Sequence, residues 1–171
     1  MRKILFAVIF LVTIMSCLNE RDCTERPDTS SIDQEQLEKD INIIEAFLEQ
    51  NDITFQTYPS GVRIATLNEG TGDQPDNCGV ASIDFERRLL GSSQTNATGI
   101  NASVTLSNAN ERKGLRFGLY NMKSGGEYRL YVPSSLAFGA DTVKNSADSV
   151  VIPPNSNLEY RIRLNGVSIS R

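Results

Sequence analysis

The residue types in this 171-residue chain limit the chemistry that it can perform. The sequence contains no histidine and three cysteines. The usual histidine-containing zinc sites are therefore excluded, as are serine or cysteine nucleophiles activated by a histidine. The three cysteines, at positions 17, 23 and 78, do not have the spacing of metal ligands. We expect neither a metal nor a cofactor.

A proline-rich corner places an aromatic side chain in a chemically interesting position. The stretch VVIPPNSNLEYRIRL covers residues 150–164, and its two prolines have no N–H to donate to a sheet. After the prolines, apolar residues alternate with charged residues, which is the period of a half-buried strand. The apolar set is Leu158, Tyr160, Ile162 and Leu164. Tyr160 is therefore predicted to lie on the buried face of a sheet.

The N-terminal residues have the pattern of an export signal. Arg2 and Lys3 precede the apolar run ILFAVIFLVTI, which is too short to span a bilayer but fits a secretory leader. Ile14 and Ser16 ahead of Cys17 resemble a bacterial lipoprotein signal, which implies cleavage after residue 16 and lipidation of Cys17. The alternative, an ordinary secretory signal with an incidental cysteine, is disfavoured because no small-x-small cleavage site follows closely.

The net charge of the chain limits the classes of partner that it can bind. The chain carries 17 Lys+Arg against 21 Asp+Glu, a net charge of −4, and loss of the leader would make it more acidic. An acidic chain is a poor nucleic-acid binder. Membrane attachment is therefore expected through the lipid on Cys17, since a basic patch is not available. The remaining length suits one domain.

Residues 17–34 are predicted to form a flexible tether. The stretch is polar, carries a proline and shows no apolar period. It includes Cys23, which could pair with Cys78 in an oxidising compartment. Because the tether shows no sign of order, we expect the two cysteines to remain unpaired thiols.

A single amphipathic helix is predicted at residues 35–52. Asp33 is placed as its N-cap, three residues ahead of Gln36. The helix has one apolar stripe, formed by Leu37, Ile41, Ile44 and Leu48. Packing of this stripe on its own domain is the default expectation, and packing on a second copy of the chain is the alternative.

Residues 53–171 are predicted to form an α+β domain. Several strand-like runs end at turns that contain glycine or proline. In VASIDFERRLL, Arg87 falls on the inward side, which indicates a bulge or a strand end. Leu115, Leu119 and Met122 recur at helical spacing, and Gly125 with Gly126 would end that helix. The expected fold is a largely antiparallel sheet wrapped around one helix and preceded by the N-terminal helix.

The order of three motifs resembles the FKBP-type peptidyl-prolyl cis-trans isomerases. These motifs are TYPSGVRIATLNEGTG, GLRFGLYNMKSGGEYRLYVPSSLAFG and VIPPNSNLEYRIRLNGV, and the similarity covers about residues 54–168. The resemblance implies the FKBP fold, prolyl-containing polypeptides as partners, and an activity that needs no nucleophile, metal or acid–base pair.

The resemblance also assigns the pocket, residue by residue. The matching catalytic positions are Phe85, Leu115, Phe138 and Tyr160, and the matching substrate-binding positions are Asn96, Val151 and Ile152. Phe85 and Phe138 stand where the family has tyrosines, Leu115 replaces a tryptophan, and Arg87 stands in place of a glycine. These changes predict weak turnover, because one missing buried donor alone costs about 1–3 kcal/mol.

Three functions are compatible with this pattern. The leading hypothesis is a lipid-anchored FKBP-like isomerase or folding helper of the bacterial cell envelope, facing the periplasm or the cell surface. The second is a non-catalytic FKBP-like module that binds peptides or proteins. The third is a structural envelope lipoprotein whose 35–52 helix pairs protomers as a dimer.

Overall fold

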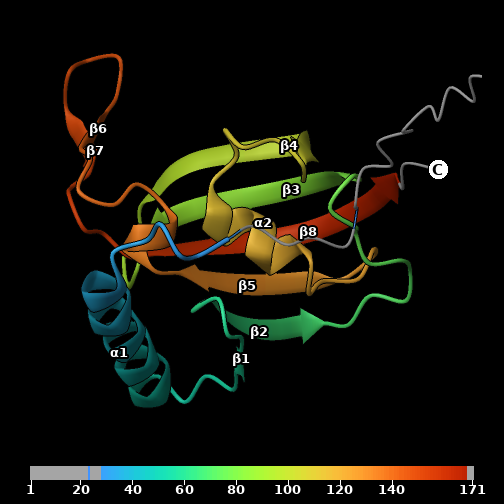
Figure 1. Ribbon diagram of the computed structural model, residues 1–171, viewed down its shortest axis with the longest axis horizontal. Coiled ribbons are helices and arrows are strands. Elements are labelled where there is room, and N and C mark those ends of the chain that lie inside the picture. The colour runs from blue at the N-terminus through green and yellow to red at the C-terminus, as the bar shows by residue number, and fades with distance from the viewer. Residues whose placement is uncertain (1–22, 24–27, 169–171) are drawn as a thin grey trace, which may run out of the picture.

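The computed structural model describes residue 23 and residues 28–168 (Figure 1). The predicted leader and Cys17 lie outside these residues. Among the described helices, none is long and apolar enough to cross a membrane. The elements are α1 (Gln34–Gln50), β1 (Gln56–Thr57), β2 (Arg63–Asn68), β3 (Val80–Leu89), β4 (Thr95–Thr105), α2 (Lys113–Leu119), β5 (Glu127–Val132), the 3-10 turn η1 (Ser134–Leu136), β6 (Val143–Lys144), β7 (Val150–Ile152) and β8 (Leu158–Ser168).

Six strands form one antiparallel sheet in the order β1-β2-β5-β8-β3-β4, and β6 pairs with β7 in a separate hairpin. Helix α2 lies across one face of the sheet, and the β6–β7 hairpin projects away from it (Figure 1). The main core lies between that face and α2, where Leu119, Leu130 and Ile162 are fully buried. The α+β prediction, with a sheet around one short helix, is confirmed.

Strand β8 lies in the middle of the sheet and has both faces occupied. Its apolar residues, including Tyr160 and Leu164, are buried on the α2 side as the alternation predicts. On the other face Glu159 is also buried, with its Oε1 lying 3.7 Å from an Arg88 nitrogen and 3.8 Å from the Arg129 Nε. Residue alternation gave no sign that a carboxylate would be enclosed here.

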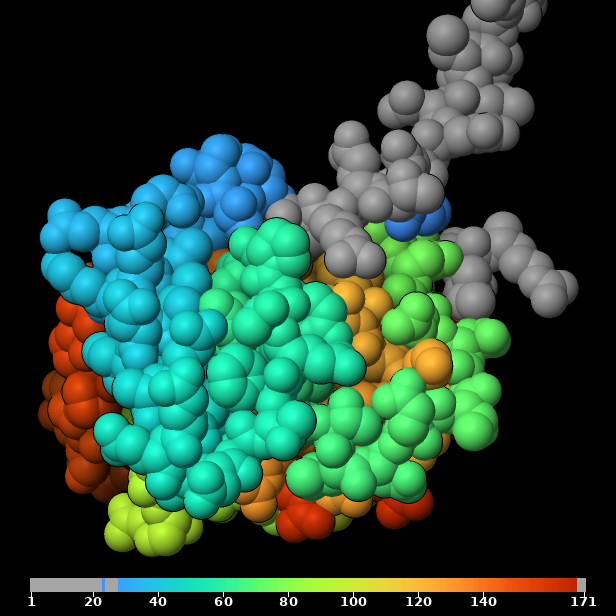
Figure 2. All heavy atoms as spheres, turned by 90° about the horizontal axis from the view of Figure 1, so that it is seen from below, coloured from blue at the N-terminus to red at the C-terminus, as the bar shows by residue number. Residues whose placement is uncertain are grey.

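Helix α1 packs on its own domain, as expected by default. The Asp33 carboxylate accepts a hydrogen bond from the Gln36 N–H at 3.1 Å, which confirms the predicted N-cap. Ile44 and Leu48 are fully buried in a second apolar cluster with Ala65 of β2 and Tyr131 of β5. Figure 2 shows α1 and the segment after it, in blue to teal, lying side by side over one face of the molecule.

Asp40 joins α1 to the turn that leads toward Phe138. Its carboxylate is fully buried and accepts hydrogen bonds from the Ser134 hydroxyl at 2.7 Å, the Ser135 N–H at 3.2 Å and the Gln36 amide at 2.8 Å. Buried polar groups need such partners. Asp40 therefore fixes η1 relative to the helix.

Replacing Asp40 by alanine should destabilise the fold. Asp40→Ala leaves two donors of η1 unpaired, the buried Ser134 hydroxyl and the partly buried Ser135 N–H, and an unpaired buried donor costs about 1–3 kcal/mol. We expect the free energy of unfolding in urea to fall by about 2 kcal/mol or more. Glu38→Ala, at an exposed position of the same helix, is the control and should stay close to the unmodified chain. Equal unfolding midpoints for the two variants would contradict this role.

The expectation of two unpaired thiols is wrong, because Cys23 and Cys78 form a disulfide. Their Cα atoms lie 5.1 Å apart, and the bond joins residues 55 positions apart. The Asn77 N–H also donates to the Cys23 carbonyl oxygen at 2.9 Å. Further along, Lys113 Nζ donates to the Asp28 carbonyl at 2.9 Å. Covalent and polar contacts hold Cys23 and Asp28 against the domain, so the lack of an apolar period in the sequence was a misleading sign at these two residues.

Removing the disulfide should lower stability. Closing a loop of this size restricts the unfolded chain and typically contributes about 2–4 kcal/mol. We expect the double variant Cys23→Ser, Cys78→Ser to lose that much free energy of unfolding. Reducing agent should move the unmodified chain to the midpoint of the variant and leave the variant unchanged. A reduced chain as stable as the oxidised one would overturn the prediction.

One local prediction needs correction. Helix α2 ends at Leu119 and does not continue to Gly125, although Met122 is still fully buried, because a turn carries it inward after the helix. Asn96, predicted only as a substrate-binding position, lies near the start of β4. Its two neighbours in the chain pair with Arg87 and Arg88 of β3. This pairing brings the Asn96 side chain close to Arg87.

Candidate functional site

Four of the side chains predicted from the motifs line one cavity of about 300 Å³ on the α2 side of the sheet. Phe85 comes from β3, Leu115 from α2, Phe138 from the segment after η1, and Tyr160 from β8. The Phe85 and Tyr160 rings are tilted at 48° with centroids 6.2 Å apart. The remaining walls are Arg87, Ala102, Ser103, Val104, Asn110, Glu111 and Arg112.

Local breaks in strand register place Phe85. Between the pairs Ile83–Ala102 and Phe85–Gly99, strand β4 has two residues, Ile100 and Asn101, where β3 has one, and the Asn101 backbone has a φ of 50°. The Asp84 carboxylate accepts hydrogen bonds from the Asn101 N–H and the Asn165 side-chain amide, each at 2.8 Å. Bulges of this kind re-aim neighbouring side chains. Asp84 thus holds the bulge next to the Phe85 ring.

Gly99 makes room for the same ring. A Cβ at this position would come within 2.5 Å of Phe85 Cε1, which no side chain could accept without moving the ring. The absence of a side chain at residue 99 therefore lets Phe85 lie across β4. This glycine is required by close approach, since its backbone needs no positive φ.

Tyr160 presents a neutral hydroxyl at the base of the cavity. Burial raises the pKa of this phenol, and the positive charge of Arg87 partly offsets the rise. The hydroxyl therefore remains protonated throughout the neutral range. Tyr160 can pack against an apolar ligand and also take part in hydrogen bonding.

Two arginines lie over the Phe138 ring, and they define the polar part of the cavity. The guanidinium carbon of Arg87 is 5.1 Å from the ring centroid, and that of Arg112 is 4.3 Å away. Arg87 is held further by its Nε, which donates to the Asn96 Oδ1 at 2.8 Å. These distances are those of cation–π contacts. The sequence marked Arg87 as inward, whereas nothing in the sequence singled out Arg112.

The structure does not bring the predicted substrate-binding residues onto this cavity. Asn96 and Val151 line a separate hollow beside β7, together with Leu89 and Pro153. Ile152 is fully buried in the main core. Asn96 nevertheless acts on the site through Arg87, whose guanidinium it positions. Among the described residues, no cluster of acidic or cysteine side chains could hold a metal ion.

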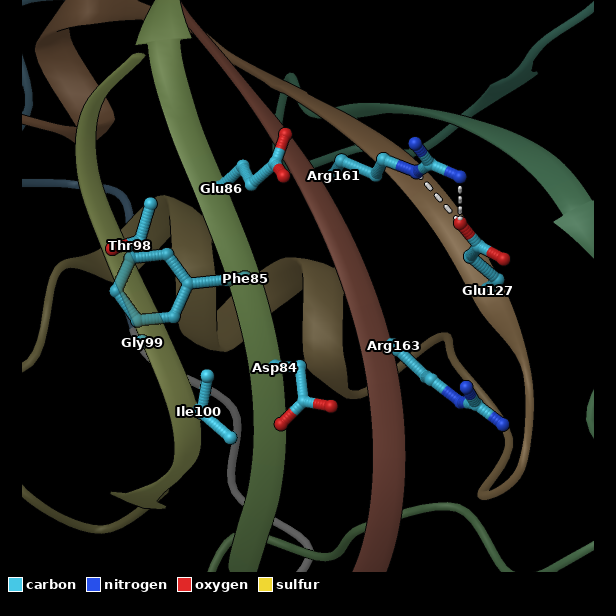
Figure 3. A pocket seen from close by; sticks show the side chains of 9 residues that line it. All are labelled: Asp84, Phe85, Glu86, Thr98, Gly99, Ile100, Glu127, Arg161 and Arg163. Carbon is cyan, nitrogen blue, oxygen red and sulfur yellow. Dashed lines mark hydrogen bonds and ion pairs between the residues drawn. The ribbon is translucent and has the colours of Figure 1, made fainter.

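A second hollow, of about 380 Å³, lies on the opposite face of the sheet, where Figure 3 shows α2 behind the strands. Phe85 reaches this hollow from β3 toward Gly99. Most of the other side chains that line it are charged or exposed. Arg161 forms an ion pair with Glu127, with a guanidinium nitrogen 2.6 Å from the carboxylate oxygen. It has no group of aromatic rings comparable to that in the cavity beside α2 and is the weaker candidate for an apolar ligand.

The Asp84 carboxyl makes the stability of the fold depend on pH. Hydrogen bonds from Asn101 and then Asn165 lower the pKa of this carboxyl from its ordinary value of 3.8. A lowered folded-state pKa stabilises the fold above the ordinary value, and this stabilisation is lost as pH falls through the folded value. Asp84→Ala should therefore be less stable at pH 7, and the gap should close as pH falls below about 4.

The neighbouring variant Glu86→Ala, which removes an exposed carboxylate of the same strand, is the matched control. Chemical denaturation at a series of pH values measures both variants. A gap between Asp84→Ala and the unmodified chain that stays constant down to acid pH would contradict the assigned role of the carboxylate.

Comparison with known proteins gives a consistent family. The family model for FKBP-type peptidyl-prolyl cis-trans isomerases matches residues 72–165. A probable FKBP-type isomerase, FkpA, of Neisseria meningitidis is 28% identical over 123 residues, covering 70% of this chain and 43% of that protein. The chloroplastic isomerase FKBP17-2 of Arabidopsis thaliana is 30% identical over 125 residues, covering 66% and 50%. The chain spans about half the length of these curated relatives.

Solved structures show the same fold. An isomerase from Pseudomonas syringae superposes with a TM-score of 0.62 at 23% identity, covering 77% of this chain and 95% of that one. FkpA of Escherichia coli superposes with a TM-score of 0.59 at 26% identity, covering 79% and 64%. The fold is therefore shared with these structures.

Proposed function

Since this chain belongs to the family of FKBP-type peptidyl-prolyl cis-trans isomerases, we propose that it catalyses rotation about X-Pro bonds in polypeptides, acting as a folding helper. The observation that carries the proposal is the single cavity that gathers Phe85, Leu115, Phe138 and Tyr160. These side chains come from four separate segments of the chain and meet at one place.

The reaction requires binding rather than bond breaking. The partial double bond of the amide sets a barrier of about 18–20 kcal/mol to rotation. An enzyme lowers this barrier by binding the twisted amide more tightly than either planar form. An apolar cavity can grip the proline ring and remove water from the amide, which weakens the charge separation that holds the planar forms. The rings of Phe85, Phe138 and Tyr160 supply such surfaces.

Polar groups for the amide carbonyl are also present. Phe138 offers no hydroxyl, but the guanidinium groups of Arg87 and Arg112 lie over its ring and carry N–H donors in a fixed plane. We assign to them the contact with the substrate carbonyl. Leu115 provides a smaller floor than an indole would, so turnover is expected to be modest.

The cellular setting is part of the proposal. The lipoprotein-like signal at residues 1–16 and the acidic composition support a chain anchored to the bacterial cell envelope by a lipid on Cys17, in a periplasmic or surface-facing position. The disulfide between Cys23 and Cys78 fits an oxidising compartment. In the domain arrangement that we propose, the lipid-bearing Cys17 precedes the disulfide-bonded Cys23, the α1 helix and the FKBP domain.

A non-catalytic binding module is the second candidate, and one observation favours it. Arg87 extends over Phe138 in the same cavity as Tyr160, so it takes up part of the space that a proline ring would use. A cavity filled in this way can hold a peptide at its rim without twisting the amide. The two candidates differ in whether peptide binding is accompanied by turnover.

The purified protein should accelerate isomerisation of a prolyl tetrapeptide above the uncatalysed rate. Phe138→Ala should reduce kcat/KM about tenfold or more, because about 1.4 kcal/mol of lost transition-state binding is a factor of ten. The control is Ile100→Ala, which alters an 83% exposed side chain on the opposite hollow. This variant should keep the unmodified rate.

The outcomes separate the candidates. No acceleration at high protein concentration, together with peptide binding that is lost in Phe138→Ala, would establish the binding module and refute catalysis. Equal activity in Phe138→Ala and the unmodified chain would place the chemistry outside this cavity.

A further inference from the structure

We infer that Arg87 and Arg112 make this cavity select prolyl peptides that carry an acidic residue next to the proline. The inference rests on the proposed function, since it takes the same cavity as the peptide site. It names the substrate class that the cavity would prefer, and it arises from two cations placed at an aromatic wall.

The charge at the cavity is opposite in sign to that of the chain. The protein carries an excess of acidic residues, 21 against 17, yet the cavity walls hold two arginines and one carboxylate, Glu111. The guanidinium carbons of Arg87 and Arg112 lie 5.1 Å and 4.3 Å from the centroid of the Phe138 ring. The walls therefore carry one net positive charge in an otherwise acidic molecule, which favours an anionic ligand group.

Neither arginine is neutralised by the rest of the protein. Among the described residues, the cations that form ion pairs with Asp or Glu are three lysines and four arginines, Arg63, Arg88, Arg129 and Arg161. Neither Arg87 nor Arg112 forms such a pair with a described residue. The Arg87 Nε is used by Asn96, which leaves the outer nitrogens of the fork for other acceptors. A guanidinium with free donors can bind a carboxylate through two parallel hydrogen bonds.

The position of the arginines indicates where the carboxylate lies on the peptide. Phe138 is a wall of the cavity that we assign to the proline ring, so a group that reaches the guanidiniums must be close to that ring. Arg112 is exposed and lies at the rim, where the residue beside the proline would lie. A short acidic side chain on that residue can reach Arg112 without entering the apolar base.

The hollow on the opposite face lacks this imbalance. Asp84, Glu86 and Glu127 line it with Arg161 and Arg163, so acidic groups outnumber basic ones there, and Glu127 is already paired with Arg161 (Figure 3). An acidic peptide would therefore find no net electrostatic attraction at that face. Preference for anions is thus a property of the cavity beside α2.

The test compares peptides that differ in one group. Isomerisation and fluorescence-anisotropy binding are measured with the purified protein on prolyl peptides that carry Glu or Gln directly before or directly after the proline. A further peptide carries the Glu several residues away. We expect kcat/KM, and the affinity, to be about tenfold higher for an adjacent Glu than for the matched Gln. The distant Glu should give no gain.

Arg112→Gln is the diagnostic variant because its side chain is exposed and the change should leave the fold intact. It should bring the Glu to Gln ratio close to one. Arg163→Gln, which removes the same charge from an exposed site on the opposite face, should keep the full ratio. Raising the ionic strength to about 1 M, where charges are screened beyond about 3 Å, should lower the ratio in the unmodified protein.

The outcomes distinguish the inference from the proposed function. Turnover with equal rates for Glu and Gln peptides would overturn the selectivity and leave the isomerase function standing. A gain that appears equally with the distant Glu, or that survives in Arg112→Gln, would also overturn it. Binding that prefers the adjacent Glu without any turnover would support the selectivity while refuting catalysis.

Discussion

The pairing of β8 with both β3 and β5 is the constraint on which the rest of the structure depends. Strand β8 is hydrogen-bonded on both edges, so its register is fixed. In this register, every second side chain of β8 faces α2, and Tyr160 is one of them. The same alternation sends Glu159 to the other face, where it lies between Arg88 and Arg129. The aromatic base of the cavity and the buried carboxylate behind it are two results of one register, and a slip by one residue would exchange them.

The cavity built on this strand combines a shared scaffold with an unusual polar wall. The main change is Arg87, which lines the cavity with Tyr160, is oriented by Asn96 and lies over Phe138. One side chain thus links three parts of the site. Where a hydroxyl would give a single donor, a guanidinium gives several donors and a permanent charge. The same substitution therefore supplies the contact proposed for the amide carbonyl and the preference for an acidic neighbour.

Much of the fold, but only part of the site, could be predicted from the sequence. The alternation around Tyr160 and the stripe of α1 gave the right buried faces, because burial of apolar side chains follows a regular period. The disulfide of Cys23 was missed, since a cross-link between two cysteines leaves no such period in the sequence. Arg112 was missed because its role depends on the loop that brings Phe138 beside it. Asn96 was predicted to bind substrate, and its hydrogen bond with Arg87 depends on the pairing of β3 with β4, which the sequence pattern did not indicate.

The central claim is that the cavity beside α2 receives the proline of a peptide. Nuclear Overhauser contacts between a bound prolyl peptide and the protein measure this most directly, independently of any rate. The account predicts contacts from the proline ring protons to the rings of Phe85, Phe138 and Tyr160 and to the Leu115 methyl groups. Proline contacts confined to Ile100 and Thr98 on the opposite face of the sheet, with none to Phe138 or Leu115, would contradict it.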